Sequence, residues 1–180
     1  AGSKATHIFM GQTFPFKVFE QSERAMAEHC IRLATQQNAL LIYPGRIYKY
    51  GKITPISEDT SATPLRDCKH GVVLKDIEDS LEAATFQKKC RVRIVRHSYP
   101  WGKAVGESMV EKNLRGIPKN ATLSWWQKRQ KFEWIATTQC PIQLSYTPDL
   151  ADFIIRYAQW SPATWFDTIN FAGTTFESMD

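Results

Sequence analysis

Residues 39–53 contain the clearest local folding signal of the sequence, because two apolar segments flank a Pro-Gly pair. Residues 39–43 read ALLIY, and residues 46–53 read RIYKYGKI. Proline presets the φ angle of the second position of a β-turn, and glycine accepts the positive φ that the third position of a type II turn requires. The pattern therefore predicts a tight β-hairpin with its turn at Pro44 and Gly45.

Amphipathic helices are predicted on both sides of this hairpin. The apolar stripe of the first consists of Met26, Cys30, Leu33 and Ala34. The stripe of the second consists of Leu74, Ile77, Leu81 and Ala84. This spacing places each set on one helix face. We expect the first helix over residues 23–37, with Ser22 as its N-cap, and the second from Asp76 to about Lys88.

Strand patterns complete the first hundred residues. Residues 7–19 are rich in Phe and Val, and residues 90–94 (CRVRI) alternate, which predicts that Arg91 and Arg93 point outward. The resulting order is β-α-β-β-α-β, which is the order of the ferredoxin-like arrangement. We therefore expect an α+β fold whose N-terminal half is ferredoxin-like.

The second half predicts a mostly helical extension. Ser124 and Gln127 match a capping box, Thr147-Pro148-Asp149 is a strong helix start, and Ser161-Pro162 predicts a short helix carrying Trp165 and Phe166. Residues 141–146 alternate like a half-buried strand. We expect one domain over residues 1–180, with possible sub-units at residues 1–100 and 101–180.

Composition predicts a soluble, intracellular, cytoplasmic protein. Hydrophobic residues make up 43% and charged residues 23%, which is typical of a globular domain. The longest apolar run, residues 39–43, is far shorter than the roughly 20 residues of a membrane-spanning helix. The N-terminal residues also lack the apolar core of a secretory signal.

The charge is unevenly distributed along the chain. The formal net charge is +5, yet residues 88–131 hold twelve Lys or Arg residues against only Glu107 and Glu111. A fold that gathers these cations on one face attracts phosphates, and counterion release favours such binding at low salt. The alternative is that the charges are scattered over a solvated surface.

Candidate ligand-binding residues follow this charge pattern. Arg46, Tyr48, Tyr50 and Lys52 share one face of the predicted second hairpin strand, where cations hold phosphates and rings stack on bases. The alternative is that the two tyrosines face the core. The remaining candidates lie in the basic stretch: Arg91, Arg93, Arg96, Lys103, Trp126, Lys128, Arg129 and Lys131.

Three functions fit this surface. The first is a non-enzymatic binder of RNA or single-stranded DNA. The second is an RNA- or DNA-processing nuclease, with His97 as the general base and Lys103 or an arginine stabilising charge. The third is a protein-interaction module, such as an inhibitor, effector or assembly factor, whose basic face meets an acidic partner.

The sequence predicts neither a cofactor nor a metal site. It contains no Walker loop, GxSxG elbow, HExxH motif or dinucleotide-binding fingerprint. The four cysteines are widely spaced and form no CxxC pair, so we expect free and mostly buried thiols. A membrane partner is not expected.

Overall fold

A computed structural model describes residues 4–12, 14, 15, 17–102, 105, 142–160 and 164–176. The chain forms two compact units. The first contains Ala1–His97 and Asp152–Phe171, and the second contains Ser98–Ala151 and Ala172–Asp180. The described strands form one sheet in each unit.

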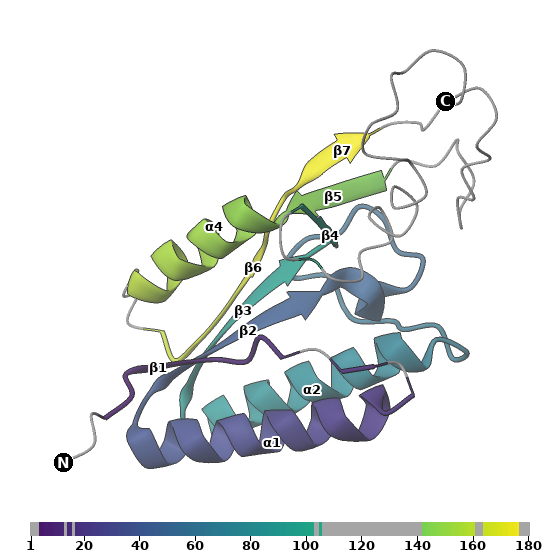
Figure 1. Ribbon diagram of the computed structural model, residues 1–180. Coiled ribbons are helices and arrows are strands. Elements are labelled where there is room, and N and C mark those ends of the chain that lie inside the picture. Colours follow the sequence, from purple (N-terminus) through teal and green to yellow (C-terminus); the bar gives the residue numbers. More distant parts are fainter. Residues whose placement is uncertain are drawn as a thin grey trace, which may run out of the picture. The chain divides into compact units, whose positions relative to one another are not determined.

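The first unit is built on a parallel sheet with the strand order β1-β2-β3-β6. Two helices lie side by side against one face of this sheet (Figure 1). The helices are α1 (Phe19–Gln37) and α2 (Lys69–Phe86). The strands are β1 (His7–Phe9), β2 (Leu40–Arg46), β3 (Arg91–His97) and β6 (Phe166–Asn170).

The core lies between these two helices and the sheet. Ala27, Cys30 and Ala34 of α1 and Ile77 and Leu81 of α2 are buried. From the sheet, the core receives Leu41, Tyr43, Val92 and Ile94. The two apolar helix stripes predicted from the sequence are therefore confirmed, since four members of the second stripe and two of the first belong to this core.

The predicted hairpin is wrong, because β2 continues through Pro44 and Gly45. The backbone N–H of Leu40 donates to the carbonyl of Thr6, and the N–H of Met10 donates to the carbonyl of Ile42. The backbone groups of every second residue of β2 therefore point toward β1. Pro44 is one of these residues, but it lies beyond the end of β1. The N–H that proline lacks would therefore have had no strand to bond to.

Gly45 serves close packing rather than a turn. A Cβ atom at this position would lie 3.1 Å from Oε1 of Glu78 on α2. After β2 the chain forms a short 3-10 helix, η1 (Ile47–Tyr50), where the sequence predicted a second strand. The helix α2 then begins at Lys69, seven residues before the predicted N-cap Asp76, which instead forms an ion pair with Arg24 of α1.

The fold is therefore a parallel α/β fold and not the predicted ferredoxin-like α+β fold. Strands and helices alternate as β1-α1-β2-α2-β3, and the described sheet of the first unit contains only parallel pairs. The strand β3 was predicted within three residues of its observed end. Its partners β2 and β6 depend on long-range pairing, which strand periodicity does not reveal.

The second unit contains a three-stranded sheet in the order β4-β5-β7. Its strands are β4 (Tyr99–Trp101), β5 (Ile142–Tyr146) and β7 (Thr174–Phe176). The pair β4-β5 is parallel and the pair β5-β7 is antiparallel. The strand β5 was predicted, but β7 was not, and the described part of residues 101–180 is not mostly helical as the sequence predicted.

The helix α4 (Thr147–Gln159) begins in the second unit and ends in the first. Its start at Thr147 confirms the predicted Thr-Pro-Asp signal. The short helix predicted around Trp165 and Phe166 is wrong, because Phe166 begins the strand β6; its predicted start at residues 161–163 lies outside the described residues. The predicted helix after Ser124 also lies outside them.

Among the described residues, no helix has the length and apolar character needed to cross a membrane. Cys30, Cys68 and Cys90 are free thiols, as predicted, and the first and last of these are buried. Within the same part of the chain, no group of three or more His, Cys, Asp or Glu side chains is arranged to hold a metal ion.

Candidate functional site

The carboxyl edge of the parallel sheet is the candidate site of the first unit. Because β1, β2, β3 and β6 are all parallel, their carboxyl ends share one edge. Ligands of open parallel sheets bind outside this edge. Arg46 ends β2 there, and η1 and the first turn of α2 follow it in the chain.

Arg46, Tyr48 and His70 form a cluster at this edge, which we call the Arg46 cluster. Nη1 of Arg46 lies 3.5 Å from Nε2 of His70. The ring of Phe19, the first residue of α1, stacks on His70 with 3.7 Å between the ring centroids. Tyr48 meets the same imidazole edge-on at 5.6 Å. The cluster therefore joins the end of β2, η1 and the starts of both helices.

The charge state of the cluster is set by burial and by Arg46. Burial, reinforced by the nearby guanidinium, lowers the pKa of His70 from 6.5 to about 4. The imidazole is therefore neutral at pH 7. Burial also raises the pKa of Glu23, which is only 4% exposed, although Arg46 opposes this shift. At neutral pH the cluster combines one permanent cation, a neutral imidazole and an aromatic ring.

His70 is expected to make the fold less stable between pH 6.5 and pH 4. The unfolded chain takes up the proton near pH 6.5 and the folded chain only near pH 4, so the free energy of unfolding falls as the pH falls through this window. With allowance for partial exposure of the ring, His70→Gln should reduce this loss by roughly 1–2 kcal/mol. Urea unfolding at pH 7, 5.5 and 4 measures it, and identical pH slopes for variant and wild type contradict it.

A buried ion network lies beside the cluster. Glu78 Oε2 of α2 accepts from Lys49 Nζ at 2.5 Å and pairs with Arg96 Nη2 at 3.0 Å. All three side chains are less than a tenth exposed. The ring of Tyr50 lies 5.0 Å from the ammonium and 5.8 Å from the guanidinium. Two basic side chains thus share one carboxylate.

Burial lowers the pKa of Lys49 even though Glu78 opposes the shift. Oε1 of Glu78 and the hydroxyl of Tyr50 are buried and have no hydrogen-bond partner among the described residues. The network is therefore only partly satisfied, which makes each remaining ionic contact more important for stability.

Glu58 holds the loop between η1 and α2 against the carboxyl edge. Its backbone carbonyl accepts a hydrogen bond from Arg96 Nη1 at 3.2 Å, and its Oε1 accepts one from the backbone N–H of Asn170 at 2.7 Å. Arg96 lies on β3 and Asn170 ends β6. This loop therefore crosses the ends of two strands, close to where a ligand of the edge is expected to lie.

The predicted strand-face residues do not form one surface. Arg46 and Tyr48 belong to the cluster, but Tyr50 is fully buried, as in the alternative interpretation of the tyrosines. Lys52 follows η1 and is exposed. The 3-10 turn breaks the period-two alternation on which the shared face depended.

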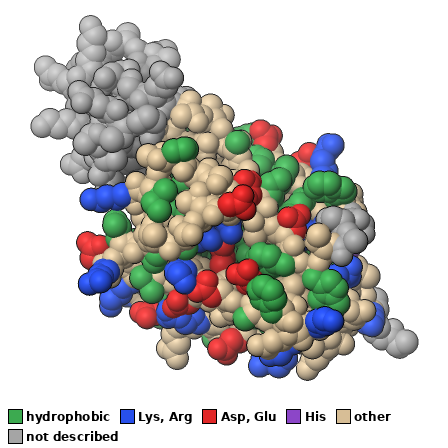
Figure 2. All heavy atoms as spheres, turned by 180° about the vertical axis from the view of Figure 1, so that it is seen from behind, with side chains coloured by type: hydrophobic (Ala, Val, Ile, Leu, Met, Phe, Trp, Pro, Cys, Tyr) green, Lys and Arg blue, Asp and Glu red, His purple; other side chains and the backbone are tan. Residues whose placement is uncertain are grey.

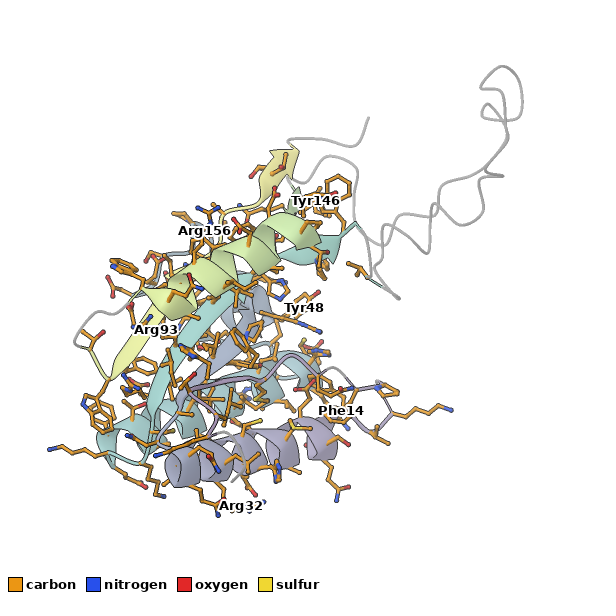
Figure 3. The ribbon with its side chains drawn as sticks, turned by 60° about the vertical axis from the view of Figure 1, so that its left-hand side comes forward. Phe14, Arg32, Tyr48, Arg93, Tyr146 and Arg156 are labelled. Atoms are coloured by element: carbon orange, nitrogen blue, oxygen red, sulfur yellow. The ribbon has the colours of Figure 1, made fainter. Side chains whose placement is uncertain are left out.

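Of the arginines of β3 that were predicted as site residues, one is exposed and two are buried. Arg91 is exposed, but Arg93 and Arg96 are 4% and 6% exposed. Arg93 lies on the side of the sheet that faces α4 (Figure 3) and donates to the backbone carbonyls of Tyr157 and Trp160. These two arginines hold structural elements together, so they do not form a solvent-facing phosphate site.

His97, the predicted general base, is buried at 6% exposure. The remaining predicted site residues lie outside the described residues: Lys103, Trp126, Lys128, Arg129 and Lys131. Sequence reasoning missed His70, Glu58 and Glu78. The start of α2 was the one signal for His70, and the prediction placed that helix start seven residues too late.

Positive charge is not gathered on the face that Figure 2 shows, where Lys and Arg side chains lie among Asp and Glu side chains. Ion pairs such as Arg24–Asp76, Lys75–Asp79 and Arg156–Asp152 account for part of this mixing. The described charges of the first unit therefore match the scattered alternative better than a single basic face.

One groove, of about 560 Å³, lies away from the carboxyl edge, between the outer surfaces of α1 and α2. Ile31, Arg32, Ser80 and Gln87 are among its lining residues. It contains none of the residues of the Arg46 cluster or the ion network. Its arginine is an exposed cation on the same unit, which makes it a useful control position.

Neither a family model nor a curated protein sequence matches this chain. Solved structures do match it. MoeE5 in complex with UDP-glucuronic acid and NAD has a TM-score of 0.75 at 13% identity, covering 95% of this chain and 58% of its own. The UDP-glucose 4-epimerase from Brucella ovis in complex with NAD has 0.72 at 12%, covering 96% and 58%.

A third match is the UDP-N-acetylglucosamine 4-epimerase from Methanobrevibacter ruminantium M1 in complex with UDP-N-acetylmuramic acid. Its TM-score is 0.71 at 13% identity, with 94% of this chain and 56% of its own chain covered. The likeness establishes a Rossmann-like α/β fold. The chain spans less than three fifths of the length of these three proteins.

These matches contradict the predicted nucleic-acid function. The three matched proteins named above are described in complex with a UDP-sugar, with NAD or with both, not with RNA or DNA. The same correction applies to the nuclease alternative, the nucleic-acid partner and the acidic protein partner, because all three predictions depended on the same basic surface. The burial of Arg93 and Arg96 supplies the physical reason.

The connection from β1 to α1 does not fit the dinucleotide that such folds hold. A dinucleotide fingerprint places three glycines between a strand and a helix, and the pyrophosphate lies at the helix N-terminus. The connection from β1 to α1, residues 10–18, contains only Gly11. The first turn of α1 also carries the acidic Glu20, which repels a phosphate. We therefore assign no NAD site to these residues.

Proposed function

We propose that this chain binds a nucleoside-diphosphate sugar at the carboxyl edge of its parallel sheet, as part of a sugar-nucleotide enzyme. The observation that carries the proposal is the position of Arg46, which ends β2 beside the first turn of α2. The matched structures that contain UDP-sugars support the ligand class.

The electrostatics of the two helix starts favour α2 over α1 for the diphosphate. The first turn of α1 carries Glu20, whereas the first turn of α2 contains no acidic residue and begins with Lys69. Helix N-termini stabilise anions, and a guanidinium bonds two phosphate oxygens with its planar fork. Arg46, Lys69 and the first-turn N–H groups of α2 thus offer the diphosphate a cationic site.

Tyr48 supplies an aromatic edge beside the cation. It is half-buried and contacts His70, so its ring is held in place by neighbours from η1 and α2. A positioned ring of this kind packs against the apolar face of a sugar or base. The neutral His70 accepts or donates one hydrogen bond at pH 7 without adding charge.

Arg46→Ala is expected to weaken binding of UDP-glucuronic acid and UDP-glucose by about tenfold to a hundredfold, because one or two charge-assisted hydrogen bonds are lost. Isothermal titration calorimetry with each UDP-sugar and with UMP measures this. Arg32→Ala is the matched control, since Arg32 is exposed on the outer side of α1 (Figure 3). Wild-type protein that binds no UDP-sugar at millimolar concentration, or equal affinities for the two variants, contradicts the proposal.

A further inference from the structure

Exposed aromatic side chains gather at the amino edge of the parallel sheet, which is the edge opposite the candidate site. Among the described residues, four Phe or Trp side chains are exposed, and three of them lie at this edge: Phe86 (80%), Trp160 (63%) and Trp165 (45%). Phe86 ends α2, Trp160 follows α4 and Trp165 precedes β6. The ends of these helices and the starts of β3 and β6 lie on one side of the first unit (Figure 1). Apolar side chains that are exposed together in this way mark an interaction surface.

Three cations lie beside these rings. Lys88, Lys89 and Arg91 follow α2 in the chain, and all three are exposed. None of them forms an ion pair with a described carboxylate. Glu82, one turn before the end of α2, is the nearest described acid along the chain. We call the aromatic and basic residues of this edge the amino-edge patch, which consists of Phe86, Lys88, Lys89, Arg91, Trp160 and Trp165.

Backbone hydrogen bonds hold the patch in place. The N–H of Lys88 donates to a carbonyl in the last turn of α2 at 2.8 Å. The carbonyl of Trp165 accepts from the N–H of Val92 at 2.9 Å, and the carbonyl of Trp160 accepts from the buried guanidinium of Arg93. The rings and cations are thus presented on an ordered backbone, so binding through them requires little further ordering of the chain.

The patch extends across the thickness of the first unit. Phe86 ends a helix that packs on one face of the sheet, whereas Trp160 bonds to Arg93 on the face toward α4 (Figure 3). A hollow of about 280 Å³ lies beside Phe86 and Trp165, and Trp160 is not one of its lining residues. A small ligand in this hollow would leave Trp160 exposed. An extended, flat partner covers both parts of the patch.

We propose that the amino-edge patch docks the first unit on the surface of a membrane that contains anionic lipids. Trp and Phe side chains are favoured at the boundary between headgroups and acyl chains. Anionic headgroups attract neighbouring Lys and Arg side chains. The sequence-based expectation of no membrane partner rested on the absence of an apolar run long enough to span a bilayer. A protein that lies on the membrane surface needs no such run.

A second copy of this chain fits the patch less well. A two-fold axis places the same surface on both subunits. Lys88, Lys89 and Arg91 would then face the same cations of the copy, and like charges across an interface repel each other. An anionic lipid surface is complementary to these three cations and also accepts the aromatic rings.

Docking through the amino edge leaves the carboxyl edge free. The two edges lie at opposite ends of the same parallel strands, so Arg46 would face away from the membrane. A water-soluble sugar nucleotide could then reach the Arg46 cluster while the protein is bound to lipid. The membrane proposal does not depend on that ligand, since it uses none of the residues of the cluster.

Co-sedimentation of the full chain with lipid vesicles tests the proposal. One set of vesicles consists of phosphatidylcholine alone, and the other also contains about one third phosphatidylserine. We expect the apparent affinity for the anionic vesicles to be at least tenfold higher at low salt, with most of this difference lost at high salt. No binding, or equal binding to both sets of vesicles, overturns the proposal.

Two pairs of variants locate the contact. Phe86→Ala is compared with Phe9→Ala, which removes the fourth exposed aromatic ring. The double variant Lys89→Glu/Arg91→Glu is compared with Lys17→Glu/Lys52→Glu, which makes the same change of charge at exposed positions outside the patch. We expect each patch variant to lose at least fivefold in affinity for the anionic vesicles, and each comparison variant less than twofold. Equal losses within either pair overturn the proposal.

A soluble polyanion separates a membrane surface from an acidic protein. Poly-glutamate is titrated against the full chain under the same low-salt conditions. Weak binding that Phe86→Ala does not change supports the lipid surface, because a polyanion uses charge alone. Binding as tight as that to the anionic vesicles, and equally sensitive to Phe86→Ala, assigns the patch to an acidic polypeptide and overturns the proposal. No sugar nucleotide is present in these samples, so failure here is distinguishable from failure of UDP-sugar binding at Arg46.

Discussion

Glu78→Ala is expected to lower the free energy of unfolding by about 3–5 kcal/mol, because removing one partner of a buried ion network leaves the others uncompensated. Lys49 and Arg96 both pair with this carboxylate, and all three side chains are less than a tenth exposed. The two cations then lie within a buried environment with no described carboxylate between them. The lost stability is mainly their desolvation cost.

Urea unfolding followed by circular dichroism measures this difference. Glu82→Ala is the matched control, because it removes an exposed glutamate from the same helix and should change stability by less than about 0.5 kcal/mol. A loss below about 1 kcal/mol for Glu78→Ala would mean that solvent or a rearranged partner compensates the two cations.

Arg93→Ala is expected to cost about 3 kcal/mol, because it removes charge-assisted hydrogen bonds to two backbone carbonyls. The guanidinium donates to the carbonyls of Tyr157 and Trp160 at the C-terminal end of α4, and it lies over the ring of Tyr157. A cation at this end also stabilises the helix dipole. Its Nε is buried and has no partner in the part of the chain that the structure describes, which offsets part of this gain.

Arg91→Ala provides the comparison, since Arg91 lies two residues earlier on the same strand and is exposed. Its replacement should change the free energy of unfolding by less than about 0.5 kcal/mol. Thermal unfolding of the two variants measures the difference. Equal effects on stability would contradict the structural role of Arg93 and return it to the solvent-facing role that the sequence suggested.

Helices and strands were predicted well where the signal lies within a few neighbouring residues of the sequence. The apolar stripe of α1 depends on spacing within one helix, and its predicted end at residue 37 matches the observed end. The start of α4 depends on three adjacent residues, Thr147-Pro148-Asp149, and was predicted correctly. The strand β5 was predicted to within one residue.

The sheet topology was not predictable from the same signals. Pro44 and Gly45 have two physical uses, and the sequence does not distinguish them. In a hairpin they form a turn, whereas here Pro44 is tolerated because β1 ends before it, and Gly45 allows Glu78 to approach. That choice depends on β1 and α2, which are distant in sequence. A hairpin prediction then produced an α+β fold in place of an α/β fold.

The candidate site was predicted only in part. Arg46 and Tyr48 were selected as members of a strand face, and they do lie together, although on a strand end and a 3-10 turn. Glu78 reads in sequence as one of several acids on a solvated helix face. Its role follows from Lys49 and Arg96, 29 and 18 residues away, so only the three-dimensional structure reveals it.

The pairing of β3 with β6 has a consequence for how the chain folds. Val92 lies beside Phe166, so the partner strand is synthesised more than seventy residues later. The elements β1, α1, β2, α2 and β3 are close in sequence and complete their contacts first, while β6 joins only after a long loop closes. Until residue 170 leaves the ribosome, the side of β3 that pairs with β6 is an open sheet edge, and such an edge is a template for pairing with other chains.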